Sequence, residues 1–435
     1  MSKAPTISKE PLPPALAVSP RAVARLKSGH PWVYRSDLAT LTSAERIPPG
    51  ALVRVTDSRG KSLGTAIYSS SSQIAIRMIA DKEAQIADFP ALVRERLHDA
   101  IAYRNHHEIV ANTDAYRVVF SEADFLPGLI VDRYNDVLSL QILTQAMDAE
   151  PVRGVIIETL VEAFQPAGIV ERVDPRIRQL EQLPPRESTL LWGRKSSTII
   201  AMNGADAGQQ TSTPRRGKAQ SRPAGADPAE TQTGIHFHYD GLAGQKTGAF
   251  LDQRENYAAA ARYAHGDALD VFCYQGGFAL HMAGCSTVTG VDISRSALEM
   301  ADKNAALNGR EMEWIEANAF DLLRDYALSG RRYDTIVLDP PAFAKTRRDL
   351  RKALGGYKEL NLRALRMLKP NGILITCSCS FHVSAAEFLE VVSDAARDTH
   401  RSLRLLENRG AAKDHPLLLN VPETGYLKCL IFNVK

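Results

Sequence analysis

Cysteine is scarce in this chain, and long apolar runs are absent. The 435 residues contain five cysteines, which show neither the density of a secreted disulfide scaffold nor the paired CxxC spacing of a zinc site. No stretch approaches the ~18 uninterrupted apolar residues of a membrane helix. The N-terminal residues are broken by prolines and lack the apolar segment of a signal peptide. We therefore expect a soluble cytoplasmic protein that binds neither a metal nor a membrane.

The composition is that of an ordinary globular protein, with 44% apolar and 24% charged residues. A chain of 435 residues exceeds the size at which one hydrophobic core usually keeps growing, so two or three domains are expected. The net charge is only +3, but the first 80 residues hold eleven Lys and Arg against four Asp and Glu. This basic segment is a candidate contact for a polyanion, and its simpler interpretation is a solvated surface without a partner.

The N-terminal half shows two successive patterns and one low-complexity tract. Residues 51–79 consist of short β-branched segments between glycines and serines, which predicts a small β-barrel. An amphipathic helix over 89–105 and strand-like runs within 118–143 predict a middle α+β region. Residues 203–233 contain no aromatic and no aliphatic residue larger than Ala, and strand-like runs flank them. We interpret this tract as a flexible insertion at the tip of a hairpin.

From residue 268 onward, predicted strands alternate with predicted helices. This alternation predicts a doubly wound, mostly parallel sheet that binds its ligands at the carboxyl ends of its strands. The predicted strands cover 269–273, 287–292, 312–317, 335–339, 373–379, 403–408 and 426–434. Helices are predicted to begin near residues 277, 296, 319, 357 and 385. The expected domains are therefore a barrel over 1–85, a middle α+β domain over 86–240 and an α/β domain over 241–435.

The first strand of this α/β region leads into a glycine turn in the string LDVFCYQGGF. Gly276 and Gly277 let backbone approach a ligand closely. Asp292, at the end of the next strand, offers a carboxylate to the two hydroxyls of a ribose. The turn has neither the G-x-G-x-x-G of dinucleotide sites nor the G-x-x-x-x-G-K-[ST] of triphosphate sites, so we predict a nucleoside cofactor without phosphates. Taken alone, the glycine pair is equally compatible with close packing of a strand and a helix.

A polar loop, GQKTGAFLDQREN, occupies residues 244–256 before that strand. Thr247, Asp252 and Arg254 offer a hydroxyl, a carboxylate and a guanidinium, which suit the ammonium and carboxylate of an amino acid. A surface ion pair between Asp252 and Arg254 is an equally simple interpretation.

The predicted strand TIVLDPPAF ends at Asp339, which two prolines follow. The prolines stiffen the loop, so the Asp339 carboxylate can hold a flat base by its hydrogen-bonding edge. An ordinary strand exit is the alternative. The aromatic Phe343 a few residues later leaves open a site for an exocyclic amine with a ring stacked beside it.

Two cysteines stand near the end of the following strand, in the string GILITCSCSF. Cys377 and Cys379 share one face of the strand, and Cys379 is nearer the carboxyl end where substrates bind. A thiolate there could add to C6 of a cytosine and so make C5 able to accept a methyl group. Free cysteines are more often inert core residues, which is our interpretation of the others, Cys273, Cys285, Cys377 and Cys429.

Several strings in one order resemble the bacterial RlmI-type family of ribosomal RNA large-subunit methyltransferases. They are GHPWVY at 29–34, FLPGLIVDRY at 125–134, GQKTGAFLDQREN, LDVFCYQGGF, LDPPAF, SCS at 378–380, DHP at 414–416 and GYLK at 425–428. The resemblance implies an N-terminal PUA domain that binds ribosomal RNA, a middle domain, and a Rossmann-like seven-stranded class I methyltransferase domain that uses S-adenosylmethionine. It leaves a homodimer open.

The resemblance also implies the roles of single residues in the synthesis of 5-methylcytosine in 23S ribosomal RNA. Cys379 would be the nucleophile, and Asp339 would orient the cytosine. The implied cofactor residues are Thr247, Asp252, Arg254, Phe272, Gly276, Asp292, Asn318 and Asp339. At Asn318, where this family often has an acidic residue, an amide oxygen would accept from the adenine amine.

Two further functions stay open at the level of sequence. One is methylation of an exocyclic base amine, for which no cysteine would be needed. The other is a non-catalytic RNA-binding factor in ribosome assembly, which the basic barrel and Asn318 would fit.

Overall fold

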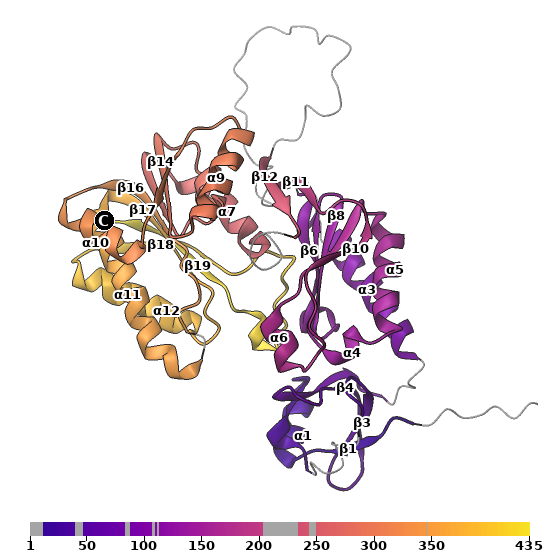
Figure 1. Ribbon diagram of the computed structural model, residues 1–435. Coiled ribbons are helices and arrows are strands. Elements are labelled where there is room, and N and C mark those ends of the chain that lie inside the picture. The colour runs from indigo at the N-terminus through magenta and orange to yellow at the C-terminus, as the bar shows by residue number, and fades with distance from the viewer. Residues whose placement is uncertain are drawn as a thin grey trace, which may run out of the picture.

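The computed structural model describes residues 12–39, 47–82, 88–106, 109–110, 113–202, 234–242, 249–344 and 346–435. These residues form two five-stranded sheets, a two-stranded hairpin and a seven-stranded sheet. Figure 1 shows the N-terminal strands below the middle sheet, with the seven-stranded sheet and its helices beside the middle sheet. Among the described residues, no helix has the length and apolar character needed to cross a bilayer.

The N-terminal sheet lies where the sequence predicts a small β-barrel. Its strand order is β1-β3-β4-β5-β2, and β1 pairs parallel with β3 whereas the other pairs are antiparallel. Helix α1 (Pro20–Lys27) follows Ser19, whose hydroxyl accepts a hydrogen bond from the amide of Ala22 and so caps the helix. The strands are β1 (Ala15–Ala17), β2 (Trp32–Tyr34), β3 (Leu52–Thr56), β4 (Ser62–Tyr68) and β5 (Ile74–Ala80).

The middle region contains a second sheet with the order β10-β9-β8-β7-β6. Helices α3 (Phe89–His106) and α5 (Val152–Phe164) pack together on one face of this sheet (Figure 1) and share a buried cluster with its strands. The predicted helix over 89–105 and the predicted strands within 118–143 are confirmed. The remaining elements are β6 (Ala115–Phe120), β7 (Leu129–Tyr134), β8 (Val137–Ile142), α4 (Gln145–Asp148), β9 (Gly168–Glu171), α6 (Pro175–Leu180) and β10 (Thr189–Gly193).

A hairpin connects the middle sheet to the last part of the chain. Its strands, β11 (Ser197–Met202) and β12 (Ile235–Asp240), pair antiparallel along their whole length. This pairing agrees with the predicted hairpin. The insertion predicted at its tip, residues 203–233, lies outside the described residues, so its flexibility stays a prediction.

The C-terminal sheet has the order β15-β14-β13-β16-β17-β19-β18. All neighbours pair parallel except β19, which pairs antiparallel with β17 and with β18. The predicted Rossmann-like, seven-stranded architecture is confirmed. Its strands are β13 (Asp267–Val271), β14 (Thr287–Asp292), β15 (Glu313–Glu316), β16 (Tyr333–Leu338), β17 (Leu368–Ser378), β18 (Leu403–Arg409) and β19 (Lys428–Val434).

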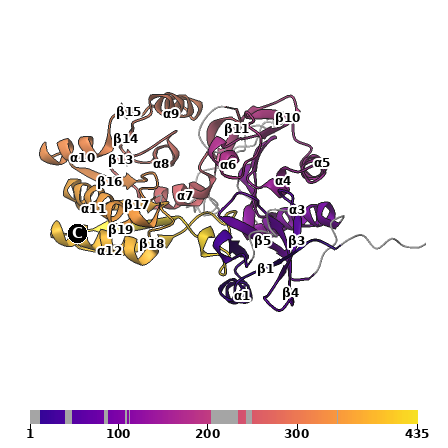
Figure 2. The same cartoon turned by 60° about the horizontal axis from the view of Figure 1, so that its bottom comes forward.

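Helices cover both faces of this sheet (Figure 2). Helices α10, α11 and α12 share the buried cluster of one face, and α7 and α8 share that of the other. Helix α11 begins at Leu350 and not near residue 357, because a capping box between Thr346 and Asp349 starts the helical backbone earlier. The helices are α7 (Arg254–Tyr263), α8 (Gly277–His281), α9 (Arg295–Leu307), α10 (Ala319–Leu328), α11 (Leu350–Met367) and α12 (Ala385–Asp398).

A buried arginine ties the middle sheet to the C-terminal sheet. The Arg104 guanidinium of α3 pairs with the Asp124 carboxylate and donates to the main-chain oxygens of Arg117 and Asp414, at 3.0 and 2.8 Å. The Asp414 carboxylate in turn accepts from the amide of Arg117 at 2.8 Å. Because these groups are buried and hydrogen-bonded, they hold the two sheets in one arrangement.

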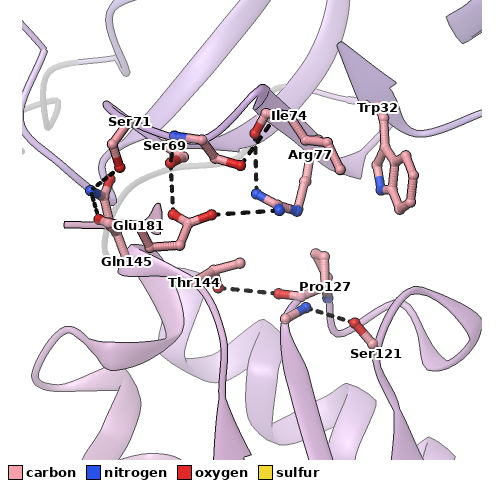
Figure 3. Close-up of polar contacts among 12 residues, drawn as sticks. Trp32, Ser69, Ser71, Ile74, Arg77, Ser121, Pro127, Thr144, Gln145 and Glu181 are labelled. Carbon is pink, nitrogen blue, oxygen red and sulfur yellow. Dashed lines mark hydrogen bonds and ion pairs between the residues drawn. The ribbon is translucent and has the colours of Figure 1, made fainter. Parts of the chain in front are cut away.

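A second polar network joins the barrel to the middle region (Figure 3). The Glu181 carboxylate accepts from the Ser69 hydroxyl at 2.6 Å and lies 3.6 Å from the Arg77 guanidinium. The Gln145 amide donates to the main-chain oxygen of Glu181 at 2.6 Å, and the Trp32 indole donates to Glu122. The barrel is therefore attached through directional contacts that specify its orientation.

Candidate active site

The segment 272–276 between β13 and α8, here called the cofactor turn, has an unusual backbone. Phe272, Tyr274 and Gly276 all have positive φ angles, of 66°, 50° and 85°. Non-glycine residues rarely adopt this region, and such strain is common at functional sites. The amides of Phe272 and Cys273 both donate to the Val291 oxygen of β14, which holds the turn at the carboxyl edge of the sheet.

The two glycines at the end of this turn have different structural roles. A Cβ on Gly277 would lie 2.4 Å from Cζ of Tyr257, so Gly277 permits close packing of α8 against α7. Gly276 has the left-handed backbone, and its Cβ would meet the Trp314 ring at 3.0 Å. The packing interpretation therefore applies to Gly277, whereas Gly276 shapes the turn itself.

Asp292 ends β14 and faces the cofactor turn. One carboxylate oxygen accepts from the amide of Tyr274 and the other from that of Ser294, both at 2.9 Å. Each oxygen keeps a lone pair for a further donor such as a ribose hydroxyl. The next residue, Ile293, is 68% exposed although it is apolar. Sequence reasoning missed Ile293, and its signal was an apolar residue in a polar turn.

Asn318 follows β15 and caps helix α10. Its side-chain oxygen accepts from the amides of Phe320 and Asp321, at 2.9 and 3.4 Å. This is the oxygen that the sequence analysis assigned to the adenine amine. Capping accounts for an asparagine at this position, and the adenine contact stays a prediction.

Residues of the polar loop before β13 lie in two environments, the lining of a cavity and the buried core. The Asp252 carboxylate accepts from the Tyr426 hydroxyl. Arg254 is fully buried, and its guanidinium lies 3.4 Å from the Asp414 carboxylate. Arg254 is thus part of a buried network and not of a surface ion pair with Asp252. Thr247, the third residue proposed from this loop, lies outside the described residues.

Asp339 directly follows β16 and lies beside the cofactor turn. Its amide donates to the Val271 oxygen at 3.2 Å, and one carboxylate oxygen accepts from the Gln253 side chain at 3.0 Å. Sequence reasoning did not single out Gln253, although it stands in the polar string before β13. The Gln253 contact fixes the direction of the carboxylate, as a group that reads a base edge requires.

Cys379 is the first residue of the loop 379–384 between β17 and α12, here called the thiol loop. Its half-buried sulfur lies 3.8 Å from the main-chain oxygen of Pro340. The thiol and the Asp-Pro-Pro segment therefore meet at one edge of the sheet. The sequence analysis assigned both Asp339 and Cys379 to one cytosine, and this assignment stays a prediction.

Burial suppresses the ionisation of three further cysteines. Cys377 is fully buried and pairs across the sheet with Cys429, and burial raises the pKa of Cys377 well above the ordinary thiol value. Burial also raises the pKa of Cys273 strongly and that of Cys285 to about 11. A thiolate is the nucleophilic form, so these environments disfavour Cys377 as a second nucleophile beside Cys379.

Two serines anchor the thiol from either side in sequence. The hydroxyls of Ser378 and Ser380 lie 3.0 and 2.9 Å from the buried hydroxyl of Tyr357. The amide of Ala344, at the end of the Asp-Pro-Pro segment, donates to the Ser380 hydroxyl at 3.2 Å. The string Ser-Cys-Ser thus places two hydroxyls in the core, which connect the thiol loop to α11 and to the Asp-Pro-Pro segment.

Phe343 packs within the protein. Its ring lies 4.8 Å from the Tyr357 ring and 6.0 Å from the Phe320 ring, measured between centroids. The sequence analysis considered this ring as a partner for a stacked base. These contacts pack the partly buried Phe343 ring against the core.

A cavity of about 460 Å³ lies between the middle sheet and the C-terminal sheet. The middle sheet contributes Arg117, Gln141 and the segment after β9 to its lining, and the C-terminal part contributes Phe250, Asp252 and Tyr426. Ligand pockets have volumes of this order. The described residues include no group of three or more His, Cys, Asp or Glu side chains that could hold a metal ion.

Two family models match the chain. One describes a PUA-like domain and matches residues 16–81, and the other describes an S-adenosylmethionine-dependent methyltransferase and matches residues 212–433. Ribosomal RNA large subunit methyltransferase I of Tolumonas auensis is 36% identical over 408 residues, which cover 92% of this chain and 94% of that protein. The protein of the same name from Shewanella denitrificans is 36% identical over 417 residues, with coverage of 94% and 96%. The chain belongs to the large subunit methyltransferase I family.

Solved structures agree with this family in fold. A chain described as a methyltransferase complexed with SAH aligns with a TM-score of 0.76 at 18% identity, over 97% of this chain and 100% of that chain. A chain described as a SAM-dependent methyltransferase from Streptococcus mutans aligns with a TM-score of 0.74 at the same identity and coverage. Together with the family models, these alignments confirm the predicted PUA-like and methyltransferase folds.

S-adenosylmethionine is the cofactor of this methyltransferase family, as predicted. The residues of the cofactor turn fit it. The left-handed backbone of Gly276 bends the cofactor turn, and its main chain can approach a ligand closely. Asp292 offers acceptors for ribose hydroxyls, and the exposed Ile293 beside it offers an apolar surface for an adenine.

Proposed function

We propose that this protein transfers a methyl group from S-adenosylmethionine to C5 of a cytosine in 23S ribosomal RNA, with Cys379 as the nucleophile. The observation that carries the proposal is the half-buried Cys379 sulfur, 3.8 Å from the Pro340 oxygen and thus beside Asp339. The family membership supports methyl transfer as the activity, and the relatives are named for methylation of ribosomal RNA of the large subunit.

Cys379 and Asp339 have separate roles in the proposed reaction. The Cys379 thiolate adds to C6 of the cytosine, which makes C5 electron-rich enough to attack an electrophilic carbon. S-adenosylmethionine supplies a methyl group on a positively charged sulfur. A water molecule or hydroxide ion from solvent then takes the C5 proton, the electrons of that C–H bond form the C5–C6 double bond, and the bond between C6 and sulfur breaks to release the thiolate. Asp339, held by Gln253, accepts from the amino edge of the base and keeps it in the plane needed for both bonds.

The proposed cofactor residues lie around the cofactor turn. Phe272, Gly276 and Asp292 would surround the nucleoside part, and Asp252 would contact the amino-acid part. Three further residues of this proposal have less support. Asn318 caps a helix, and Arg254 is buried beside the Asp414 carboxylate. Thr247 lies outside the described residues.

The proposed RNA contact involves the barrel and the cavity between the two larger sheets. The first 80 residues carry the excess of Lys and Arg that suits a phosphate backbone. The target base must leave its stack to reach Cys379, which costs roughly a few kcal/mol, so we expect a loop or another open RNA segment as substrate. The domain boundaries at 85 and 240, the cytoplasmic location and a homodimer stay predictions.

Exocyclic amine methylation has less support, because the Phe343 ring packs on Tyr357. A non-catalytic assembly factor would not require the contact between the thiol and the Asp-Pro-Pro segment. Failure to bind S-adenosylmethionine in calorimetry would favour that third function.

The decisive experiment compares Cys379→Ala with Cys285→Ala. Both variants are incubated with 23S ribosomal RNA fragments and a labelled methyl donor, and the digested RNA is analysed by mass spectrometry. We expect Cys379→Ala to abolish formation of 5-methylcytosine and Cys285→Ala to preserve it, because Cys285 lies at the other end of the strands, near Asp267 and Asp334. Full activity of Cys379→Ala would refute the covalent mechanism. A methylated amine as product would refute C5 as the methylated position.

A further inference from the structure

A buried lysine holds the thiol loop in place. Lys428, the first residue of β19, is 6% exposed. Its ammonium donates to the main-chain oxygens of Ser380, Val383 and Tyr426, at 2.7, 2.8 and 2.8 Å. Ser380 directly follows Cys379, so two of the three hydrogen bonds end on the loop that presents the thiol.

The charge of Lys428 calls for a reason beyond hydrogen bonding. Within the described part of the chain, the hydrogen bonds of its ammonium all end on neutral carbonyls, and burying an ammonium without a bound anion is unfavourable. Burial lowers the pKa of Lys428 to about 8, whereas negative charge at Cys379, and then at Glu387 of α12, acts in the opposite direction. A buried cation at this position can stabilise an anion that forms during the reaction, such as a thiolate at Cys379.

The neighbouring phenols do not supply a negative charge that would balance the Lys428 ammonium. Burial raises the pKa of Tyr357 on α11 and raises that of Tyr426 well above its ordinary value, and charge on Cys379 adds to both shifts. Both phenols therefore stay neutral at neutral pH. Asp339 directly precedes Pro340, whose main-chain oxygen lies 3.8 Å from the Cys379 sulfur. Negative charge on Asp339 would oppose a thiolate, which makes a cation near the thiol loop more important.

We propose that Lys428 is a positioning residue for Cys379, whose ammonium fixes the thiol loop and stabilises the thiolate by its charge. This inference rests on the proposed function, in which that thiolate attacks the base. A lysine or arginine beside a cysteine lowers the pKa of the thiol. A positive charge held by three carbonyls, two of them on the thiol loop, keeps a fixed position relative to that loop.

The test is the pH dependence of the alkylation of Cys379 by iodoacetamide in the full chain, followed by mass spectrometry of the peptide that carries Cys379. In the unsubstituted protein, we expect the midpoint below the value of a free thiol, about 8.5. In Lys428→Met, it should rise by about one unit, which makes alkylation near pH 7 about tenfold slower. Lys428→Arg keeps the charge and should retain a lowered midpoint.

Two results would overturn the inference. One is a folded Lys428→Met variant whose midpoint equals that of the unsubstituted protein. The other is a midpoint at or above that of a free thiol in the unsubstituted protein, a measurement that holds even if Lys428→Met does not fold. Alkylation requires neither RNA nor methyl donor. The assay therefore judges Lys428 separately from the Cys379→Ala experiment, which judges the proposed function.

Discussion

The buried carboxyl group of Asp270 should make the stability of the protein fall as pH rises. Asp270 lies in β13, in the interior of the seven-stranded sheet, and one of its oxygens accepts from the amide of Ala279 at 2.9 Å. Burial, with smaller contributions from the charges of Asp339 and Asp292, raises the pKa of Asp270 to about 8. Between its ordinary pKa near 4 and this value, the folded protein holds a proton that the unfolded chain has lost.

The sign and size of the effect follow from this proton. Where the folded state binds one proton more, the free energy of unfolding decreases by about 1.4 kcal/mol per pH unit. The contribution of Asp270 is thus fully present below about pH 4 and is lost progressively up to about pH 8. Between pH 5 and pH 7 the loss amounts to about 2.7 kcal/mol. Asp270→Asn keeps an oxygen for the Ala279 amide but cannot ionise, so it should lack this component.

The measurement is urea unfolding of both proteins at pH 5, 6, 7 and 8, because the difference between two such curves cancels the other titrating groups. We expect the variant to gain about 2.7 kcal/mol relative to the unsubstituted protein from pH 5 to pH 7. Asp302→Asn, at an exposed position of α9, is the matched control and should follow the unsubstituted protein. A difference between Asp270→Asn and the unsubstituted protein that stays constant with pH would refute the reasoning.

Three further substitutions test the packing around the site. Asp414→Asn removes the carboxylate that lies 3.4 Å from the buried Arg254 guanidinium, which also lies 4.0 Å from Glu255, and should lower the free energy of unfolding by about 3 kcal/mol in denaturant unfolding. Gly277→Ala places a Cβ 2.4 Å from Cζ of Tyr257 and should lower the free energy of unfolding by about 1–3 kcal/mol. Glu181→Gln weakens the contacts between barrel and middle region, and limited proteolysis should release the barrel faster.

Each of these expectations has a control or a contrary outcome. Gly284→Ala introduces a Cβ with no atom within 4 Å and should not show the penalty of Gly277→Ala. Unchanged denaturant midpoints for Asp414→Asn would mean that the network is not a source of stability. Equal proteolysis rates for Glu181→Gln and the unsubstituted protein would mean that other contacts attach the barrel.

Much of the fold is predictable from the sequence because its signals are local. Apolar strands that alternate with amphipathic helices predict the seven-stranded α/β sheet, and β-branched segments between glycines predict the N-terminal barrel. The predicted start of α11 was wrong, because the capping box that precedes the helix lies in a polar stretch without apolar periodicity. The position of β19 between β17 and β18 depends on pairing between distant segments, which periodicity does not encode.

The site residues at the carboxyl ends of strands were predictable from the sequence. Asp292 ends β14, whereas Asp339 and Cys379 directly follow β16 and β17, so all three lie at the carboxyl edge of the sheet. Gln253 and Lys428 were not singled out, because each acts through a side chain that reaches a residue far away in sequence. The roles proposed for them rest on the contacts to Asp339 and to the thiol loop, which the sequence does not show.

The strand order imposes a sequence of events on the growing polypeptide. β18 pairs with β19 and has no other strand neighbour among the described residues, yet β18 precedes β19 in the chain. During synthesis from the N-terminus, β18 must wait outside the sheet until β19 has been made and docked on β17. Lys428 arrives with β19, so an organised thiol is one of the last features that a nascent chain acquires. A nascent chain with its barrel already folded would therefore still lack the positioned thiol.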